Sequence, residues 1–293
     1  MRSRVAQIVI FTAACLLPDK PRVQAQSAPC PPHSASASVD KQPVGAEISI
    51  AAVTFSGLLQ MPTSDQDQIA ASIKHRTYGN SLDGVTDEAV ERVKAGWQDH
   101  GYFRVQVSGQ ERMLTSSPAS QRMALSFQVE EGLQYTLGEI TFKNNKVISD
   151  VAALRGLFPI NDGDIFSREK IAKGLENLRK AYGDRGYINF TSVPDTKFDD
   201  EKKMIALNID MDEGKQFYVR SVNVVGLDEP ARQEILKDLP IKRGQIYTSK
   251  LWELFLLKYG SMLPACGCQE ELGLDDHTGA VAVTLDFRPC STD

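Results

Sequence analysis

Three stretches of this chain alternate apolar and polar residues with a period of two. They are Leu125–Val129, Ile205–Ile209 and Val281–Phe287. Successive side chains of a β-strand point to opposite faces, so this pattern predicts strands with one apolar face. We therefore expect sheets that are packed on one side and face solvent on the other.

An amphipathic helix is predicted before each of these strands, because apolar residues recur there at spacings of three and four. A Gly and then a Ser or Thr precede each helix. The hydroxyl of Thr86, Ser167 or Thr248 is expected to cap it by accepting from an early helical N–H. The apolar faces are Val90, Val93 and Trp97; Ile171, Leu175, Leu178 and Tyr182; and Trp252, Phe255, Leu256 and Tyr259.

Further landmarks return in the same order along the chain. A β-rich run ending in a turn residue occurs three times, whereas Gly-Tyr after the helix and Glu-Gly after the last strand occur twice each. These landmarks are "VTFSG", "ITFKN" and "VNVVG"; Gly101-Tyr102 and Gly186-Tyr187; and Glu131-Gly132 and Glu213-Gly214. Such self-similarity is the signature of a repeat protein.

Each repeat reads as β-α-α-β-β over roughly 80 residues, with a weaker first helix in every copy. We assign the copies to residues 46–132, 133–214 and 215–293. The predicted fold class is α+β: tandem domains, each a three-stranded mixed sheet with two helices on one face. The bridges between copies are short, so a semi-rigid rod is expected.

The N-terminus resembles a secretory signal peptide. Arg2 and Arg4 precede an apolar run that is too short to span a bilayer, and "VQA" offers small residues before a cleavage after Ala25. Residues 1–25 are therefore assigned to the signal, with a lipoprotein box at Thr12–Cys15 as the alternative. Residues 26–45 are rich in Pro, Ser and Ala and are predicted to form a flexible tether.

The composition of the chain limits the classes of function that it can have. The chain has 293 residues, 42% of them hydrophobic, and a formal net charge of −5. That length and apolar content suffice for more than one core. An acidic chain without a basic stripe is a poor candidate for nonspecific nucleic-acid binding.

The segment Glu131–Asp195 resembles the POTRA (polypeptide-transport-associated) family, especially the repeats of BamA-type outer-membrane assembly factors. The resemblance extends over roughly residues 46–290 and is weakest in the third copy. It implies a periplasmic location, association with the outer membrane, and docking of accessory subunits or unfolded outer-membrane proteins. Family members continue into a membrane β-barrel; too few residues follow the third copy for one, so we expect only the periplasmic half of that function.

Signs of an enzyme are few. The sequence has no nucleophile elbow, P-loop or dinucleotide fingerprint, and we predict no catalytic, cofactor-binding or metal-binding residue. Asp275, Asp276 and His277 could form an acid/base or metal cluster, which is the basis of an alternative as a hydrolase or metal-dependent enzyme. A solvated turn before the last strand is the favoured interpretation of these three residues.

The cysteines favour a disulfide, because the chain is predicted to be exported. Residues at the open end of the last hairpin face each other, which makes Cys266–Cys290 the preferred pair and Cys268–Cys290 the alternative. A zinc site formed by these three cysteines and His277 is the less favoured hypothesis. The pairing of Cys30 is left open.

The predicted binding site is main chain at a sheet edge. The second strand of each unit is expected at the edge, where an extended peptide can add by β-augmentation. We place the candidate edges at Tyr102–Val107 and Tyr187–Val193, with the residues Tyr102, Val105, Val107, Tyr187, Phe190 and Val193. The expected partners are an outer-membrane assembly or secretion component and unfolded client peptides. An envelope scaffold like the single-POTRA division proteins, or the product of a truncated gene, is the alternative.

Overall fold

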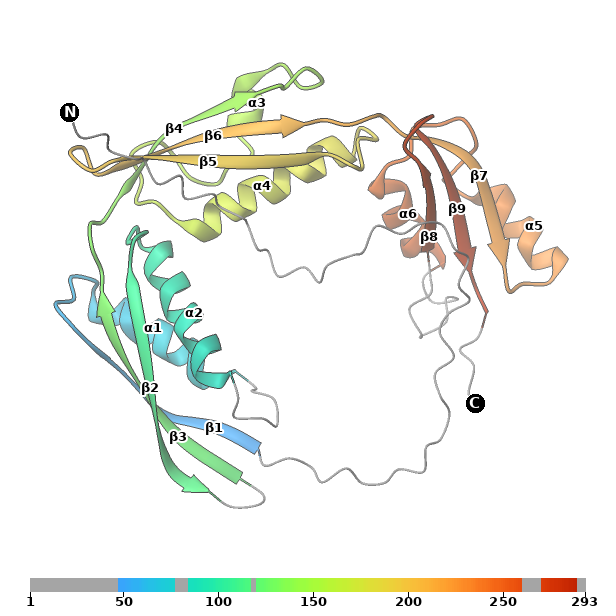
Figure 1. The fold of residues 1–293 in the computed structure, drawn as a ribbon. Coiled ribbons are helices and arrows are strands. Elements are labelled where there is room, and N and C mark those ends of the chain that lie inside the picture. The colour runs from blue at the N-terminus through green and yellow to red at the C-terminus, as the bar shows by residue number, and fades with distance from the viewer. Residues whose placement is uncertain (1–46, 77–83, 117–119, 260–269, 289–293) are drawn as a thin grey trace.

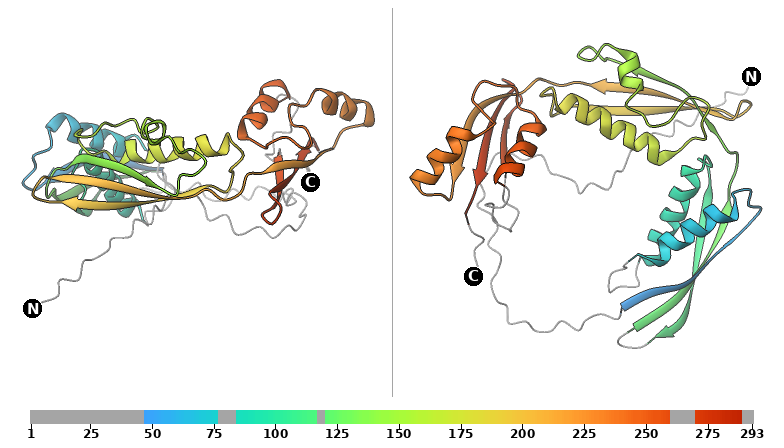
Figure 2. Two further views of the ribbon diagram at one scale, coloured as in Figure 1. Left: turned by 90° about the horizontal axis from the view of Figure 1, so that it is seen from above. Right: turned by 180° about the vertical axis from the view of Figure 1, so that it is seen from behind.

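A computed structural model describes residues 47–76, 84–116, 120–259 and 270–288 of the chain. These residues form three successive units, each with its own three-stranded sheet and its own helices (Figure 1). The units follow one another along an open curve, and each sheet keeps its helices on one side (Figure 2). The α+β class and the tandem β-α-α-β-β order are thus confirmed.

The first unit consists of β1 (Glu47–Ser56), α1 (Thr63–Lys74), α2 (Val85–Asp99), β2 (Gln106–Ser116) and β3 (Ser120–Glu130). The strand order is β1-β3-β2, with β1 parallel and β2 antiparallel to the central β3. The predicted alternation in β3 packs its apolar side chains against both helices.

The second unit repeats this plan with β4 (Thr136–Lys143), α3 (Val151–Arg155), α4 (Arg168–Gly183), β5 (Thr191–Asp199) and β6 (Met204–Asp212). Its strand order is β4-β6-β5. The first helix is only five residues long and is capped by the side chain of Asp150, which accepts from two backbone amides.

The third unit contains β7 (Tyr218–Val225), α5 (Glu229–Asp238), α6 (Ser249–Tyr259), β8 (Glu270–Asp275) and β9 (Ala280–Asp286). Its strand order is β7-β9-β8, again with the last strand central. A separate buried cluster lies under each of the three sheets, so the units do not share one core.

Two local predictions were wrong. The extended runs after Gly-Tyr begin later than predicted, because residues Tyr102–Val105 and Tyr187–Phe190 first form hydrogen-bonded turns that bury aromatic side chains. Thr86 does not cap its helix: α2 starts at Val85, and the Thr86 hydroxyl donates to Glu111 of β2. Ser167 does cap α4 as predicted, by accepting from the amide of Lys170.

Within the described ranges, no helix has the length and apolar content needed to cross a bilayer. The predicted signal peptide and tether lie outside the described residues, as do Cys266, Cys268 and Cys290. The disulfide therefore stays a prediction.

Candidate binding edges and the joints between units

The second strand of each unit lies at a sheet edge, with one flank unpaired. This holds for β2, β5 and β8 in the three sheets. Of the predicted edge residues, Val107 lies in β2 and Val193 in β5. The other four precede the strands, in the turns described above: Tyr102, Val105, Tyr187 and Phe190. Tyr102, Val105 and Phe190 are also buried, so their side chains belong to the cores.

The direction of the main-chain groups on β5 follows from the pairing of β6. The amide of Thr136 in β4 donates to the carbonyl of Lys203, so Lys203 faces β4. Alternate residues of a strand face the same neighbour, and Ile209 therefore faces β4 as well. Its partner across the ladder is Pro194, whose backbone nitrogen must then point away from β6 to the free edge.

Pro194 consequently blocks the middle of the β5 edge. Proline has no N–H, so the outward row of β5 lacks a donor at its centre. A proline on an edge strand is a common means of discouraging further strand pairing. Val193, although 59% exposed, thus lies on a strand that is poorly suited to accept a peptide.

The β2 edge is open. The Ser56 hydroxyl donates to the carbonyl of Phe127, which places that carbonyl on the β1 side of β3. The ladder partner of Phe127 is Gly109, so Gly109 and its alternate neighbours Val107 and Glu111 turn their N–H and C=O groups outward. None of the 11 residues of β2 is a proline.

β2 is also held close to the helix layer. A side chain at Gly109 would come within 2.8 Å of Val90 of α2 and 3.1 Å of the Phe127 ring. Glu111 accepts from the Thr86 hydroxyl of the same helix. These contacts fix the strand from one side while its outer flank stays unpaired. By comparison, β8 has only six residues.

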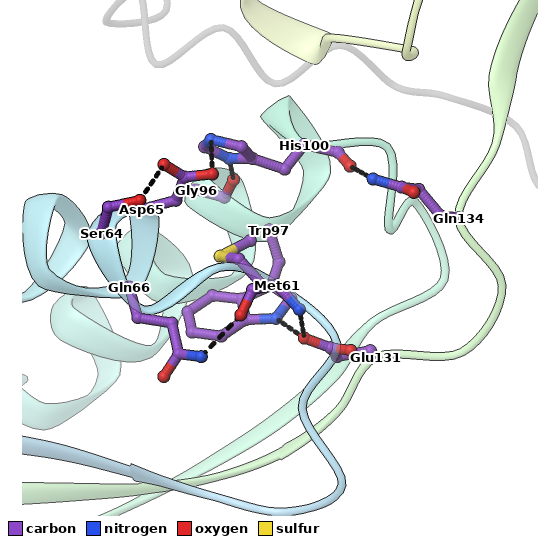
Figure 3. Close-up of polar contacts among 9 residues, drawn as sticks. All are labelled: Met61, Ser64, Asp65, Gln66, Gly96, Trp97, His100, Glu131 and Gln134. Carbon is purple, nitrogen blue, oxygen red and sulfur yellow. Dashed lines mark hydrogen bonds and ion pairs between the residues drawn. The ribbon is translucent and has the colours of Figure 1, made fainter.

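The repeated Glu-Gly landmark closes each of the first two units. The carboxylate of Glu131 is 3% exposed and accepts from the amides of Gln60 (2.6 Å) and Met61 (3.1 Å) and from the Trp97 indole (2.9 Å; Figure 3). It thereby ties the loop between β1 and α1 to the end of α2. The Met61 carbonyl in turn accepts from the Gln66 side chain.

Glu213 has the equivalent role in the second unit. It accepts from the Val147 amide (2.8 Å) in the loop after β4 and from the Tyr182 hydroxyl (2.9 Å) at the end of α4. Trp97 and Tyr182 occupy the same helix position, five residues before the tyrosine of Gly-Tyr. In the third unit Tyr259 is at the aromatic position, and Pro289 follows Leu285 by four residues, as Glu131 follows Phe127 and Glu213 follows Ile209.

The residues after Glu-Gly join one unit to the next. At the first joint the Gln134 side chain donates to the His100 carbonyl (2.9 Å; Figure 3), and the Tyr135 amide donates to the Gly101 carbonyl (2.9 Å). Gly101 has φ +87°, and a side chain there would lie 2.7 Å from the Tyr135 carbonyl and 2.9 Å from Ile165. Gly-Tyr therefore ends the helix and also makes room for the following unit.

The second joint repeats these bonds. The Gln216 side chain donates to the Arg185 carbonyl (2.8 Å), and the Phe217 amide donates to the Gly186 carbonyl (2.9 Å). A side chain at Gly186 would collide with Ile246. Gly-Tyr therefore occurs twice because the described part of the chain contains two joints of the same construction.

Side chains reinforce the first joint. Phe103 of the first unit packs edge-to-face on Phe166 of the second, with the ring centres 5.4 Å apart. Arg104 reaches Asp200 (3.0 Å), which also accepts from the Tyr135 hydroxyl (2.8 Å). These two hydrogen bonds lower the pKa of Asp200, while burial and the bond to Asp200 raise the pKa of Tyr135 to about 12.

A second carboxylate crosses the same joint. The Asp99 side chain, at the end of α2, accepts from the amide of Glu169 in the first turn of α4 (2.6 Å). The early amides of a helix have no partner within it, so Asp99 satisfies one of them from the neighbouring unit. Burial at this contact raises the pKa of Asp99 above its ordinary value.

The Asp-Asp-His sequence forms the turn between β8 and β9. Asp275 accepts from the amides of His277 and Thr278 and from the Thr278 hydroxyl, and this hydroxyl is the main reason why the pKa of Asp275 is lowered. Asp276 accepts from Asn189 of the second unit (2.6 Å), and the His277 carbonyl accepts from Lys215. These contacts belong to the turn and to the second joint. Nowhere in the described ranges do three metal-ligating side chains converge.

A broad hollow of about 870 Å³ lies at the helix-free face of the second sheet, close to the β5 edge. Asp195, Asp210 and Asp212 line it, and Asn144 donates to Asp210 (2.6 Å). Small-molecule pockets are mostly apolar and enclosed. The carboxylate lining and open form of this hollow instead match a solvated surface.

Comparison with known proteins agrees with this architecture. Residues 135–214 match the POTRA family described as "Surface antigen variable number repeat". The structure resembles the crystal structure of Haemophilus influenzae BamA POTRA3-5, with a TM-score of 0.59 and 21% identity over 83% of this chain and 96% of that one. Residues 135–214 are therefore a POTRA domain, and the chain is built from successive units of this fold.

Two curated relatives are outer membrane protein assembly factors named BamA. The protein from Buchnera aphidicola is 22% identical over 165 residues, or 56% of this chain and 26% of the relative. The protein from Neisseria meningitidis serogroup B is 23% identical over 213 residues, or 69% of this chain and 26% of the relative. The chain thus spans about a quarter of the length of these relatives.

Proposed function

We propose that this protein is a non-enzymatic periplasmic module of outer-membrane protein assembly or secretion that binds extended segments of partner or client proteins along the free edge of β2. The names of the BamA relatives and the POTRA fold support the general role. The observation that carries the binding mode is the contrast between the open β2 edge and the β5 edge interrupted by Pro194.

Main-chain pairing suits a handler of varied segments, because it depends little on side-chain identity. Val107, Gly109 and Glu111 each turn one donor and one acceptor outward, enough for up to about six hydrogen bonds at a net ~0.5–1.5 kcal/mol each. Ordering an extended peptide costs much of that gain. We therefore expect weak and reversible binding.

The decisive experiment removes one outward donor. Glu111→Pro deletes the outward N–H and leaves the ladder to β3, because this residue does not bond β3. The control is Glu111→Ala, which loses the same side-chain contact to Thr86 but keeps the N–H. Binding of a labelled extended outer-membrane peptide is measured by fluorescence anisotropy, with circular dichroism to verify folding.

We expect Glu111→Pro to weaken binding about fivefold or more, since ~1 kcal/mol is lost per hydrogen bond, and Glu111→Ala to bind like the wild type. The reciprocal change, Pro194→Thr, supplies the missing donor and should create a second site on β5. Equal affinities of the Pro and Ala variants, with both folded, would remove β2 as the binding edge. Wild-type protein that captures envelope proteins but no extended peptide would favour the scaffold alternative.

A further inference from the structure

The outward face of α6 carries two exposed leucines. Leu254 is 46% exposed and Leu257 is 85% exposed, while Phe255 and Tyr259 of the same helix are buried against the sheet. Leu254 and Leu257 are three residues apart and so lie side by side on the helix surface. The core therefore does not account for these two leucines.

The other two units do not have this apolar face. Trp97, Tyr182 and Tyr259 are the equivalent last buried aromatics of their helices, and they align α2 and α4 with α6. On this alignment neither position holds a large apolar residue in the other two units. The residues there are Arg92 and Asn177 at the position of Leu254, and Ala95 and Lys180 at the position of Leu257.

Basic residues flank Leu254 on the helix surface. Lys250 and Lys258 are exposed and lie four residues before and after Leu254, on the same side of the helix. The one acidic residue of α6, Glu253, lies four residues before Leu257, and its carboxylate is 4.0 Å from the exposed Lys180 side chain of the second unit. In a chain with a net charge of −5, this face is locally basic and apolar.

We propose that this face of α6 binds the surface of an anionic lipid membrane. Leu254 and Leu257 enter the boundary between headgroups and acyl chains, and Lys250 and Lys258 lie at the phosphates. This is how amphipathic segments with lysine beside leucine bind anionic bilayers. A protein partner fits less well, because the two leucines among the described side chains of this face offer far less than the ~800 Å² per partner of a stable protein interface.

Membrane contact at α6 is independent of peptide binding at β2, since the two sites lie in different units (Figure 1). It would hold the third unit against a bilayer while the β2 edge stays free. Failure of one proposal would leave the other in place.

The test replaces the two exposed leucines of α6 with the residues at the aligned positions of α4. Leu254→Asn together with Leu257→Lys gives α6 the residues found at the same positions of α4. The matched control is Leu58→Asn, which removes a leucine that is 96% exposed in the first unit. Flotation of the full chain with phosphatidylglycerol/phosphatidylcholine vesicles and with pure phosphatidylcholine vesicles measures partitioning. Hydrogen exchange over residues 249–259 locates the contact.

We expect the wild type and Leu58→Asn to partition at least tenfold more strongly onto the anionic vesicles than the double variant does. Only vesicle-bound wild type and Leu58→Asn should gain exchange protection in α6. Replacing Lys250 and Lys258 with Glu should abolish the preference for anionic lipid. Equal partitioning of the double variant and wild type, or unchanged exchange in α6 on bound protein, would overturn the proposal. So would a change in oligomeric state of the double variant without any effect on vesicle binding, which would assign the face to a second copy.

Discussion

The carboxylate of Glu131 allows a quantitative test of how one residue holds the first unit together. Three donors converge on it: the amides of Gln60 and Met61 and the indole of Trp97. Glu131→Ala leaves all three without an acceptor in a site where the carboxylate is 3% exposed. A buried donor that loses its partner costs about 1–3 kcal/mol, and water can reach the partly exposed Gln60 amide. We expect a loss of ~3–5 kcal/mol in the free energy of unfolding of this unit.

Glu131→Gln should cost less, about 1–2 kcal/mol, because the amide oxygen can still serve the Met61 and Trp97 donors. The equivalent change Glu213→Ala removes the acceptor from only two donors, the exposed Val147 amide and the Tyr182 hydroxyl. It should cost ~1–2 kcal/mol. The structure thus predicts that Glu131→Ala lowers the free energy of unfolding more than Glu213→Ala does.

Urea unfolding followed by tryptophan fluorescence measures the first of these losses. Trp97 is fully buried in the first unit, and a Trp252→Phe background makes it the only tryptophan of the chain. Its fluorescence then reports that unit alone, which matters because a chain of several units need not unfold in one step. The Glu213 variant is followed by circular dichroism. A cost below ~1 kcal/mol for Glu131→Ala, or a larger cost for Glu213→Ala, would refute the assignment of Glu131 as the main clasp.

Three further predictions concern the joints and the cysteines. Gly101→Ala should lower the free energy of unfolding by ~2–3 kcal/mol and increase inter-unit motion in small-angle scattering. Gly84 has a similar φ of +85° but no atoms near the position of a Cβ, so Gly84→Ala should lower the free energy of unfolding by only ~1 kcal/mol. Equal effects of the two substitutions would contradict the argument from close contact at Gly101. Because the folded pKa of Tyr135 is raised to about 12, its contribution to stability is complete below about pH 10 and lost as the pH rises toward 12. The loss of stability as the pH rises from about 10 toward 12 should therefore be smaller in Tyr135→Phe. A profile of stability against pH that is the same in both proteins would contradict this role of Tyr135. Non-reducing peptide mapping should find Cys290 linked to Cys266 or, in the alternative, to Cys268, and free thiols at all of the cysteines would contradict the disulfide.

Alternation and helical spacing sufficed to predict the fold. The buried faces of β3, β6 and β9 are those expected from the period of two. Trp97 and Tyr182 lie at the buried helix positions that the spacing of three and four predicts. These signals are reliable because each depends only on which face of one element is buried.

The start of the edge strands could not be predicted in this way. Tyr102 and Tyr187 are aromatic and begin an alternating run, which is typical of a strand. In the structure their amides continue the hydrogen bonding of the preceding helix, to the carbonyls of Trp97 and Tyr182. Tertiary packing overrides strand propensity at these positions, since the turns bury Phe103 and Phe190 in a core.

The candidate site was predicted only in part. That the second strand forms an edge follows from the order β-α-α-β-β, but which edge is open does not. Pro194 was visible in the sequence, yet its effect depends on whether its nitrogen points toward β6 or away from it. That direction follows from the register of Pro194 against Ile209 and from the bond between Thr136 and Lys203, two contacts between segments distant in sequence.

The number of times each landmark occurs has a physical explanation in the joints. The alternating last strand and the aromatic near the helix end serve the core of their own unit, and they recur in all three units. Gly101 and Gly186 instead make room for Ile165 and Ile246 of the following unit. Gly-Tyr occurs twice, and the described chain contains two joints of this construction. A landmark that recurs with every unit therefore marks the fold, and one that recurs with every joint marks the interface between units. This distinction predicts that substitutions at Gly101 or Gly186 change the angle between units in addition to lowering stability.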